Sequence, residues 1–114
     1  MEDFNSFDQY QQLAASTAIY PDQFRLIYPI LGLTNEAGEV AGKLKKIMRD
    51  EDFSGVLTSE QEEVLAAELG DVLWYLAAVT TDMGLSLGGI AHENIDKLFD
   101  RKDRGVLGGS GDNR

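Results

Sequence analysis

The segment AAELGDVLWYLAAV, residues 66–79, consists mainly of helix-forming apolar residues and carries only two charged side chains, Glu68 and Asp71. These two acids are three residues apart and therefore lie on one face of a helix. A helix that is apolar nearly all round is normally buried, and an ionised carboxylate out of water is costly unless a positive charge compensates it. The segment therefore predicts either a buried helix with its two carboxylates beside a cation, or a helix less buried than its composition indicates.

Hydrophobic periodicity and capping residues predict four helices and no strand. Ser6 followed three residues later by Gln9 is typical of a helix start, and Thr34 is a candidate cap for the second helix. Pro29 lies in an aromatic segment ahead of that helix, and Gly84 ends the third. The expected helices are Ser6–Ile19, Thr34–Arg49, Thr58 or Ser59 to Met83, and Ser86–Arg104. The fold class is all-α, a four-helix bundle.

The composition is that of one ordinary globular domain, with 43% hydrophobic and 26% charged residues among 114. The chain has no cysteine, which excludes disulfides and thiolate metal sites. Its 20 acidic and 10 basic residues give a net charge of −10, which argues against a general nucleic-acid binder. No apolar run is expected to approach the ~20 residues that span a membrane, and the acidic start does not resemble a secretory signal. A cytoplasmic protein without a membrane partner is expected.

A second pair of acids, Glu36 and Glu39, lies on the second predicted helix in the segment TNEAGEV. If the second and third helices form an antiparallel hairpin, Glu36 and Asp71 each lie 13 residues from the ends of the turn. Glu39 and Glu68 each lie 10 residues from those ends. At about 1.5 Å per residue, the two levels are about 20 Å and about 15 Å from the turn. The four carboxylates are therefore expected to converge across the hairpin.

Four carboxylates at one place repel one another, and a divalent cation between them removes that conflict. Oxygen ligands without cysteine favour a hard ion, Mg²⁺ or Mn²⁺. A di-iron site built on Glu-x-x-His is disfavoured, because the only histidine, His92, has Gly89 three residues before it. The competing interpretation is structural: Glu39 and Lys43 form an ion pair within one helix, and Glu36 is a favourable acid in a first turn.

These motifs resemble those of the MazG-like members of the all-α nucleoside triphosphate pyrophosphohydrolases. The two acid motifs of that family, Glu-x-x-Glu and Glu-x-x-Asp, correspond to EAGE and ELGD, with 28 residues between Glu39 and Glu68. The resemblance extends over YQQLAASTAIYP, YPILGLTNEAGEVAGKLKKIMRD and ENIDKLFDRKDRG, and the last segment matches an Asn-x-x-Lys-x-x-x-Arg pattern. Many relatives have a further Glu before the first motif, where this chain has Asn35. The resemblance assigns residues 1–104 to a MazG-like domain and residues 105–114 to a Gly-rich C-terminal tail.

The resemblance implies Mg²⁺-dependent cleavage, with Mn²⁺ as the substitute ion, between the α- and β-phosphates of a (deoxy)nucleoside triphosphate. The products are the monophosphate and pyrophosphate. The residues implied to bind the metal are Glu36, Glu39, Glu68 and Asp71, with Glu36 or Glu39 also orienting the attacking water. The residues implied to contact the substrate are Lys43, Tyr75, Asn94, Lys97 and Arg101. Lys97 and Arg101 would meet phosphate charge, whereas a helix ion pair and packing are the simpler interpretations of Lys43 and Tyr75.

Relatives assemble as dimers or dimers of dimers, so the resemblance implies a homodimer or homotetramer in which dimerisation completes the bundle. A non-catalytic helical dimer that binds a nucleotide or a partner as a regulator is the alternative function. In the tail, Asp112 and Arg114 are candidates to close over the phosphates, and a disordered end is the simpler expectation. A role in removing unwanted nucleotides and a role in adjusting one nucleotide pool are both compatible with these residues.

Overall fold

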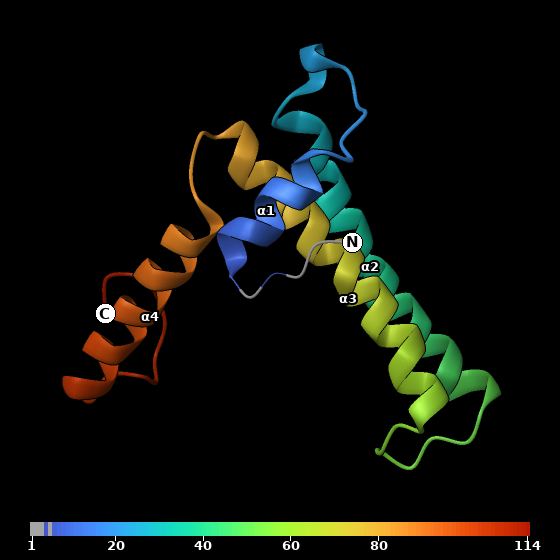
Figure 1. Cartoon of the computed structure of the whole chain (residues 1–114). Coiled ribbons are helices and arrows are strands. Elements are labelled where there is room, and N and C mark those ends of the chain that lie inside the picture. The colour runs from blue at the N-terminus through green and yellow to red at the C-terminus, as the bar shows by residue number, and fades with distance from the viewer. Residues whose placement is uncertain (1–3, 5) are drawn as a thin grey trace.

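The computed structural model describes residue 4 and residues 6–114, and this part of the chain contains four α-helices, one short 3-10 helix and no strand (Figure 1). The all-α prediction is confirmed. Residues 1–3 and 5, which open the predicted domain 1–104, lie outside the described residues. The elements are α1 (Phe7–Ala15), η1 (Asp22–Phe24), α2 (Ile27–Asp50), α3 (Ser59–Asp82) and α4 (Leu87–Asp103).

The longest elements, α2 and α3, form an antiparallel hairpin of two 24-residue helices (Figure 1). Thr58 caps α3 as predicted: its hydroxyl accepts a hydrogen bond from the backbone N–H of Gln61, and the Gln61 side chain accepts one from the N–H of Thr58 (3.2 and 3.0 Å). Gln61 is buried and also donates to Glu51 (3.3 Å), which ties the helix start to the connecting loop. Gly84, at a φ of +72°, follows the end of α3 where the sequence places it.

The start of α2 differs from the sequence prediction, because Pro29 lies inside the helix and not before it. Pro29 is the third residue of α2, where a backbone N–H has no partner within the helix, so the missing donor of proline leaves no hydrogen bond broken. The prediction that Thr34 caps this helix is therefore wrong; the Thr34 hydroxyl donates to the carbonyl oxygen of Ile30 (3.3 Å). Ser6 caps α1 as predicted, but α1 ends at Ala15, four residues before its predicted end.

The core of the protomer is small and lies where α1 crosses α3, near the start of α4 (Figure 1). Its buried residues are Ala14, Ala77 and Leu87, one from each of these three helices. This core fixes α1 on α3 and, through Leu87, the first turn of α4. The partly buried side chains that pack against the core are Tyr10, Leu73, Trp74 and Leu76.

Two polar side chains of α1 determine the direction in which α4 leaves α3. The Gln11 side chain accepts a hydrogen bond from the backbone N–H of Leu87 (2.7 Å) and donates one to the carbonyl oxygen of Leu85 (3.0 Å). Asp8 accepts from the backbone N–H of Gly88 (2.8 Å) and places a negative charge at the N-terminus of α4, where the helix dipole favours it. Held in this way, α4 packs against α1 and the end of α3 and then diverges from the α2–α3 hairpin (Figure 1).

The resulting single chain is open and exposes much apolar surface. Its radius of gyration is 17.2 Å, whereas a compact chain of this size has roughly 13 Å. Leu31 of α2, Leu69 of α3 and Phe99 of α4 each have more than half of their surface exposed (66%, 56% and 59%). The helices α2, α3 and α4 therefore each carry an apolar face that the rest of the chain does not cover.

By length and composition, α3 is apolar enough to cross a membrane, so the expectation that no apolar run approaches that length is wrong. Only 17% of its most apolar window is buried inside the protomer. Glu68 and Asp71 lie near the middle of this helix, where a charged side chain is expensive in lipid. These two carboxylates disfavour a lipid environment for α3.

Candidate functional site

Three of the four predicted carboxylates meet across the α2–α3 hairpin. One oxygen each from Glu36, Glu68 and Asp71 lies within 4.8 Å of the others, and we call these three residues the carboxylate cluster. Glu68 and Asp71 are one turn apart on α3, and Glu36 faces them from α2. Glu39 is exposed and outside this close group. Its role as a fourth ligand stays a prediction.

The carboxylate cluster gathers more negative charge than its neighbours neutralise. Partial burial, then the charge of Asp71 and the contact with Glu68, raise the pKa of Glu36 above its ordinary value. Lys43 Nζ lies 4.0 Å from Glu68 Oε1, at the limit of an ion pair. In the described part of the chain Lys43 thus pairs across the hairpin with Glu68, and not with Glu39 on its own helix as the structural interpretation expected. Lys43 is therefore within reach of any anion bound at the cluster.

The cluster fits a hard divalent cation. Oxygens bound to one Mg²⁺ lie about 2.0–2.1 Å from the ion, and therefore at most about 4.2 Å from one another. The three oxygens lie within 4.8 Å, so small side-chain rotations suffice to bring them onto one ion. A cation at this position would also remove the repulsion that raises the pKa of Glu36.

Tyr75, one turn after Asp71, joins the cluster to a group of aromatic rings. Its ring packs against Gly32 of α2 so closely that a Cβ at Gly32 would collide with it. The ring centroids of Tyr28 and Trp74 lie 6.3 and 5.0 Å from that of Tyr75. Burial, then a hydrogen bond with Tyr28 and the nearby carboxylates, raise the pKa of Tyr75 above its ordinary value. The sequence places Tyr75 on the face of Asp71, but nothing in the pattern singles out Gly32.

Two neighbouring cavities share Trp74 as a wall. The Trp74 indole N–H donates to the Thr17 hydroxyl (2.8 Å), which fixes the ring between them. One cavity, of about 360 Å³, opens onto the carboxylate cluster and is lined by Thr17, Glu36, Asp71, Trp74 and Tyr75. The lining of the other, of about 200 Å³, includes Ala14, Ala18, Tyr20, Arg25, Trp74 and Asp82.

Asp82 braces the segment that closes the smaller cavity. Its Oδ2 accepts hydrogen bonds from the Tyr20 hydroxyl and from the backbone N–H of Leu26, both at 2.8 Å. Leu26 has a φ of +67° and a ψ of −52°, a backbone conformation that a leucine rarely adopts, and this bond helps to hold it. Burial, followed by the bond to Asp82, raises the pKa of Tyr20 to about 12. The sequence motifs do not include Asp82; its one signal in the sequence is an acid at the C-terminal end of a helix, where the dipole disfavours it.

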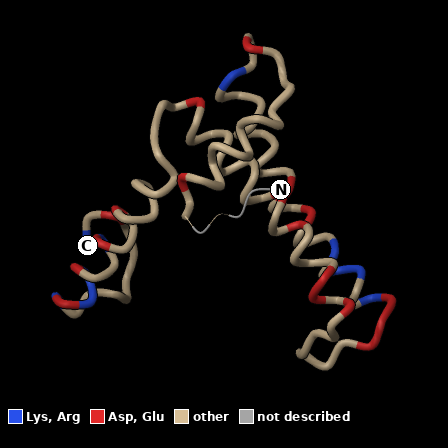
Figure 2. The backbone as a smooth tube through the Cα atoms, in the orientation of Figure 1, with Lys and Arg blue, Asp and Glu red and all other residues tan. Residues whose placement is uncertain are grey.

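The predicted phosphate-binding residues of α4 lie on the arm that diverges from the hairpin. Asn94 and Lys97 are exposed and line a shallow cavity on α4, whereas Arg101 is buried and donates to Asp112 (2.9 Å). Figure 2 shows charged residues along the hairpin and, well apart from them, near the end of α4. Within the single chain, therefore, these three residues do not join the carboxylate cluster.

The sequence model of the MazG nucleotide pyrophosphohydrolase domain matches residues 28–106, which include the whole carboxylate cluster. The chain belongs to the MazG family. This MazG-family protein is also 50% identical to the Gene 37 protein of Mycobacterium phage L5 over an alignment of 113 positions that covers 94% of this chain and 97% of the phage protein. No solved structure matches it. The family match confirms the resemblance inferred from the two acid motifs.

Proposed function

We propose that this MazG-family protein is a Mg²⁺-dependent nucleoside triphosphate pyrophosphohydrolase, with Mn²⁺ as the substitute ion. It would cleave a (deoxy)nucleoside triphosphate between the α- and β-phosphates to give the monophosphate and pyrophosphate. The observation that carries the proposal is the carboxylate cluster, in which acidic oxygens from two helices converge beside a cavity. Membership of the MazG family supports the same reaction class.

The four acids of the two motifs, Glu36, Glu39, Glu68 and Asp71, would hold the ion. When bound, the ion would neutralise phosphate oxygens and lower the pKa of a bound water molecule. Glu36 or Glu39 would hold the attacking water, since both lie on α2 and Glu36 faces the other two carboxylates. Lys43 would donate to a phosphate oxygen from its position 4.0 Å from Glu68.

The two cavities support one orientation of the nucleotide. Its phosphates would lie at the carboxylate cluster, and its sugar and base would lie along Tyr75 and Trp74 toward the smaller cavity. Asp71 and Asp82 are about 16 Å apart along α3, a distance comparable with the length of an extended nucleotide. At the far end, Arg25 and Asp82 offer a hydrogen-bond donor and an acceptor to a base.

We also propose that the working form is a homodimer or homotetramer in which α4 of one copy approaches the carboxylate cluster of another. Support comes from the open protomer, the exposed apolar faces of α2, α3 and α4, and the divergence of α4 from the hairpin (Figure 1). In that arrangement Asn94 and Lys97 would meet the phosphates of a substrate held by the other copy. Phe99→Glu, which places a charge on the exposed face of α4, is expected to lower the mass measured by light scattering.

The proposed reaction is tested by measuring pyrophosphate release from a panel of ribo- and deoxynucleoside triphosphates with Mg²⁺. Glu68→Gln removes one cluster charge, and Glu63→Gln is the matched control because Glu63 is an exposed acid of the same helix outside the cluster. We expect release by the intact chain and the control, and a loss of at least about 100-fold in Glu68→Gln.

Two results would contradict this proposal. No release from any nucleotide by a folded, metal-loaded protein would favour the alternative of a non-catalytic nucleotide-binding or partner-binding regulator. Equal losses in Glu68→Gln and Glu63→Gln would show that the carboxylate cluster is not the site of the reaction.

A further inference from the structure

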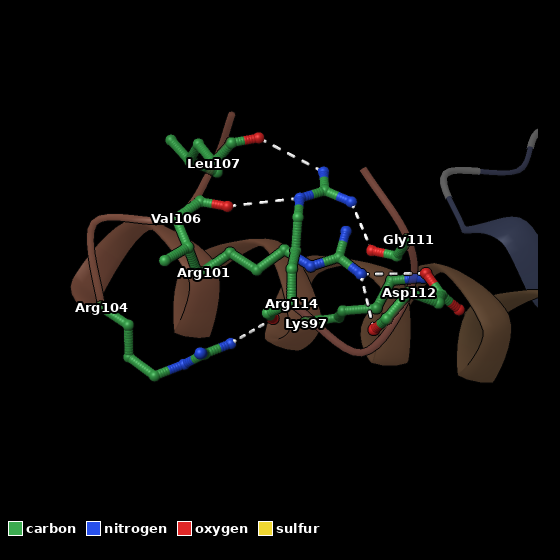
Figure 3. A network of polar contacts seen from close by, with 8 residues as sticks. All are labelled: Lys97, Arg101, Arg104, Val106, Leu107, Gly111, Asp112 and Arg114. Atoms are coloured by element: carbon green, nitrogen blue, oxygen red, sulfur yellow. Dashed lines mark hydrogen bonds and ion pairs between the residues drawn. The ribbon is translucent and has the colours of Figure 1, made fainter. Parts of the chain in front are cut away.

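The tail after α4 is folded back along that helix, so the expectation of a disordered end is wrong (Figure 3). The Arg114 guanidinium donates to the carbonyl oxygens of Val106, Leu107 and Gly111 (3.3, 3.3 and 2.6 Å). Arg104, which follows the last residue of α4, in turn donates to the backbone oxygen of Arg114 (2.7 Å). These contacts to backbone oxygens close the tail into a loop without using the side chain of Asp112.

The closed loop presents the Asp112 carboxylate to two cations of α4. Asp112 Oδ1 lies 3.1 Å from Lys97 Nζ and accepts from Arg101 Nη2 at 2.9 Å (Figure 3). The same nitrogen of Arg101 donates to the backbone carbonyl oxygen of Asp112 (3.0 Å). One oxygen thus receives two positively charged donors, which is also how a phosphate oxygen is recognised. We call Lys97, Arg101 and Asp112 the α4–tail network.

We propose that the Asp112 carboxylate is a built-in competitor at Lys97 and Arg101, the two predicted phosphate-binding cations, and that a phosphate chain must displace it from them. The class of ligand rests on the proposed function, since a nucleoside triphosphate and released pyrophosphate both carry such a chain. The Asp112 carboxylate is therefore an internal competitor that weakens the site when no phosphate is present.

The exposure of the three side chains gives the order of the exchange. The side chains of Lys97 and Asp112 are 42% and 78% exposed, so their ion pair is screened by water and easily replaced. The side chain of Arg101 is only 6% exposed and lies behind the tail. A phosphate therefore binds Lys97 first and contacts Arg101 only when the tail moves aside.

The tail can move without unravelling, because its closing contacts do not depend on Asp112 Oδ1. Gly109 and Gly111 have φ values of +91° and +85°, conformations that glycine adopts without strain. The bonds from Arg114 to three carbonyl oxygens lie within the loop itself, so the loop can move as one piece once the bonds from Arg104 to Arg114 and from Arg101 to the backbone of Asp112 are released.

The test is the affinity of the full chain for inorganic tripolyphosphate in the absence of divalent metal, measured by titration calorimetry. Without metal the carboxylate cluster holds no cation that could bind the anion, so binding reports on the cations of α4. Asp112→Asn keeps the shape of the side chain and removes its charge; the matched control is Asp100→Asn, which removes an exposed charge paired with Arg104 (2.9 Å) on the same helix. We expect Asp112→Asn to bind roughly two- to fivefold more tightly than the intact chain, Asp100→Asn to change less, and Lys97→Met to lose binding.

Amide NMR signals of Gly109, Gly111 and Asp112 provide the second readout, and they should shift when tripolyphosphate binds the intact chain. Unchanged or weaker binding by Asp112→Asn, with its tail signals still dispersed, would overturn the proposal and make Asp112 a positioning residue. Equal increases in tripolyphosphate affinity in Asp112→Asn and Asp100→Asn would also overturn the proposal, because they would show an effect of net charge alone.

This test separates the tail from the reaction. A protein without hydrolytic activity that shows the expected tripolyphosphate pattern would contradict the proposed function alone. An active enzyme whose Asp112→Asn variant does not bind tripolyphosphate more tightly would contradict the proposal for the tail alone.

Discussion

The carboxylate cluster and the α4–tail network are built in opposite ways. In the cluster, three acids face one another with one ammonium group 4.0 Å from Glu68, and the pKa of Glu36 is raised by partial burial and by its acidic neighbours. In the network, two cations share the carboxylate of Asp112, whose pKa they lower. The cluster carries negative charge that the rest of the chain does not neutralise, whereas the charges of the network already neutralise one another. A cation can therefore simply enter the first region, but an anion must compete for the second.

The largest effect is expected when the cluster loses one of its charges. Glu36→Gln should lower the affinity for Mn²⁺, measured by titration calorimetry, by at least about 100-fold, because one of three converging ligands is lost. Glu39→Gln is the matched variant, one turn along the same helix and exposed, and should lose less. Equal losses of Mn²⁺ affinity in the two variants would show that Glu39 is also a metal ligand.

The next effect concerns the packing that holds the two walls of the cluster together. Gly32→Ala should lower the free energy of unfolding in urea by about 1–3 kcal/mol, because the new Cβ collides with the ring of Tyr75. Gly38→Ala, at a helical position with nothing within 4 Å of the new Cβ, should instead raise it by up to about 1 kcal/mol. A Gly32→Ala chain as stable as the intact one, at equal protein concentration, would show that the ring does not fix the distance between α2 and α3.

A smaller effect is the pH dependence of the metal-free protein. The folded state raises the pKa of Glu36 from 4.5, so the contribution of Glu36 to stability is present below that value and is lost as the pH rises through the raised value. The ionisation of Glu36 should therefore lower the melting temperature of the metal-free chain as the pH rises above 4.5. Mn²⁺ should suppress this decrease, and Glu36→Gln should remove it. The same slope in Glu36→Gln would assign it to another acid, and Glu63→Gln should leave it unchanged.

The sequence predicts best what local chemistry determines. The starts of α3 and α4 follow from the side-chain caps Thr58 and Ser86, and the end of α3 follows from Gly84. The convergence of Glu36 with Asp71 follows from equal rise along two paired helices. The early start of α2 is missed, because a proline in a first turn leaves the same trace in the sequence as one that precedes a helix.

The direction of α4 cannot be read from the pattern, because contacts distant in sequence determine it. Gln11 and Asp8 hold the start of α4 through hydrogen bonds to residues 76 and 80 positions away. Nothing local distinguishes these two side chains from solvated residues on the face of a helix. The sequence therefore predicts Lys97 and Arg101 as cations for phosphate but not their separation from the cluster, nor the carboxylate of the tail that meets them.

The smallest effect is expected at that carboxylate, and its sign is opposite to that of Glu36. Arg101 and Lys97 lower the pKa of Asp112 below 3.8, so the stabilisation of the tail is present above that value and is lost as the pH falls through the lowered pKa. The amide signals of Gly109 and Gly111 should lose dispersion only in that acidic range, with little change in global unfolding, since the carboxylate is largely exposed. Asp112→Asn should abolish this transition and Asp100→Asn should keep it. A transition that survives in Asp112→Asn would mean that the backbone contacts of Arg114 alone control the tail, and the contrast between an acid-stabilised cluster and an acid-sensitive tail would then fail.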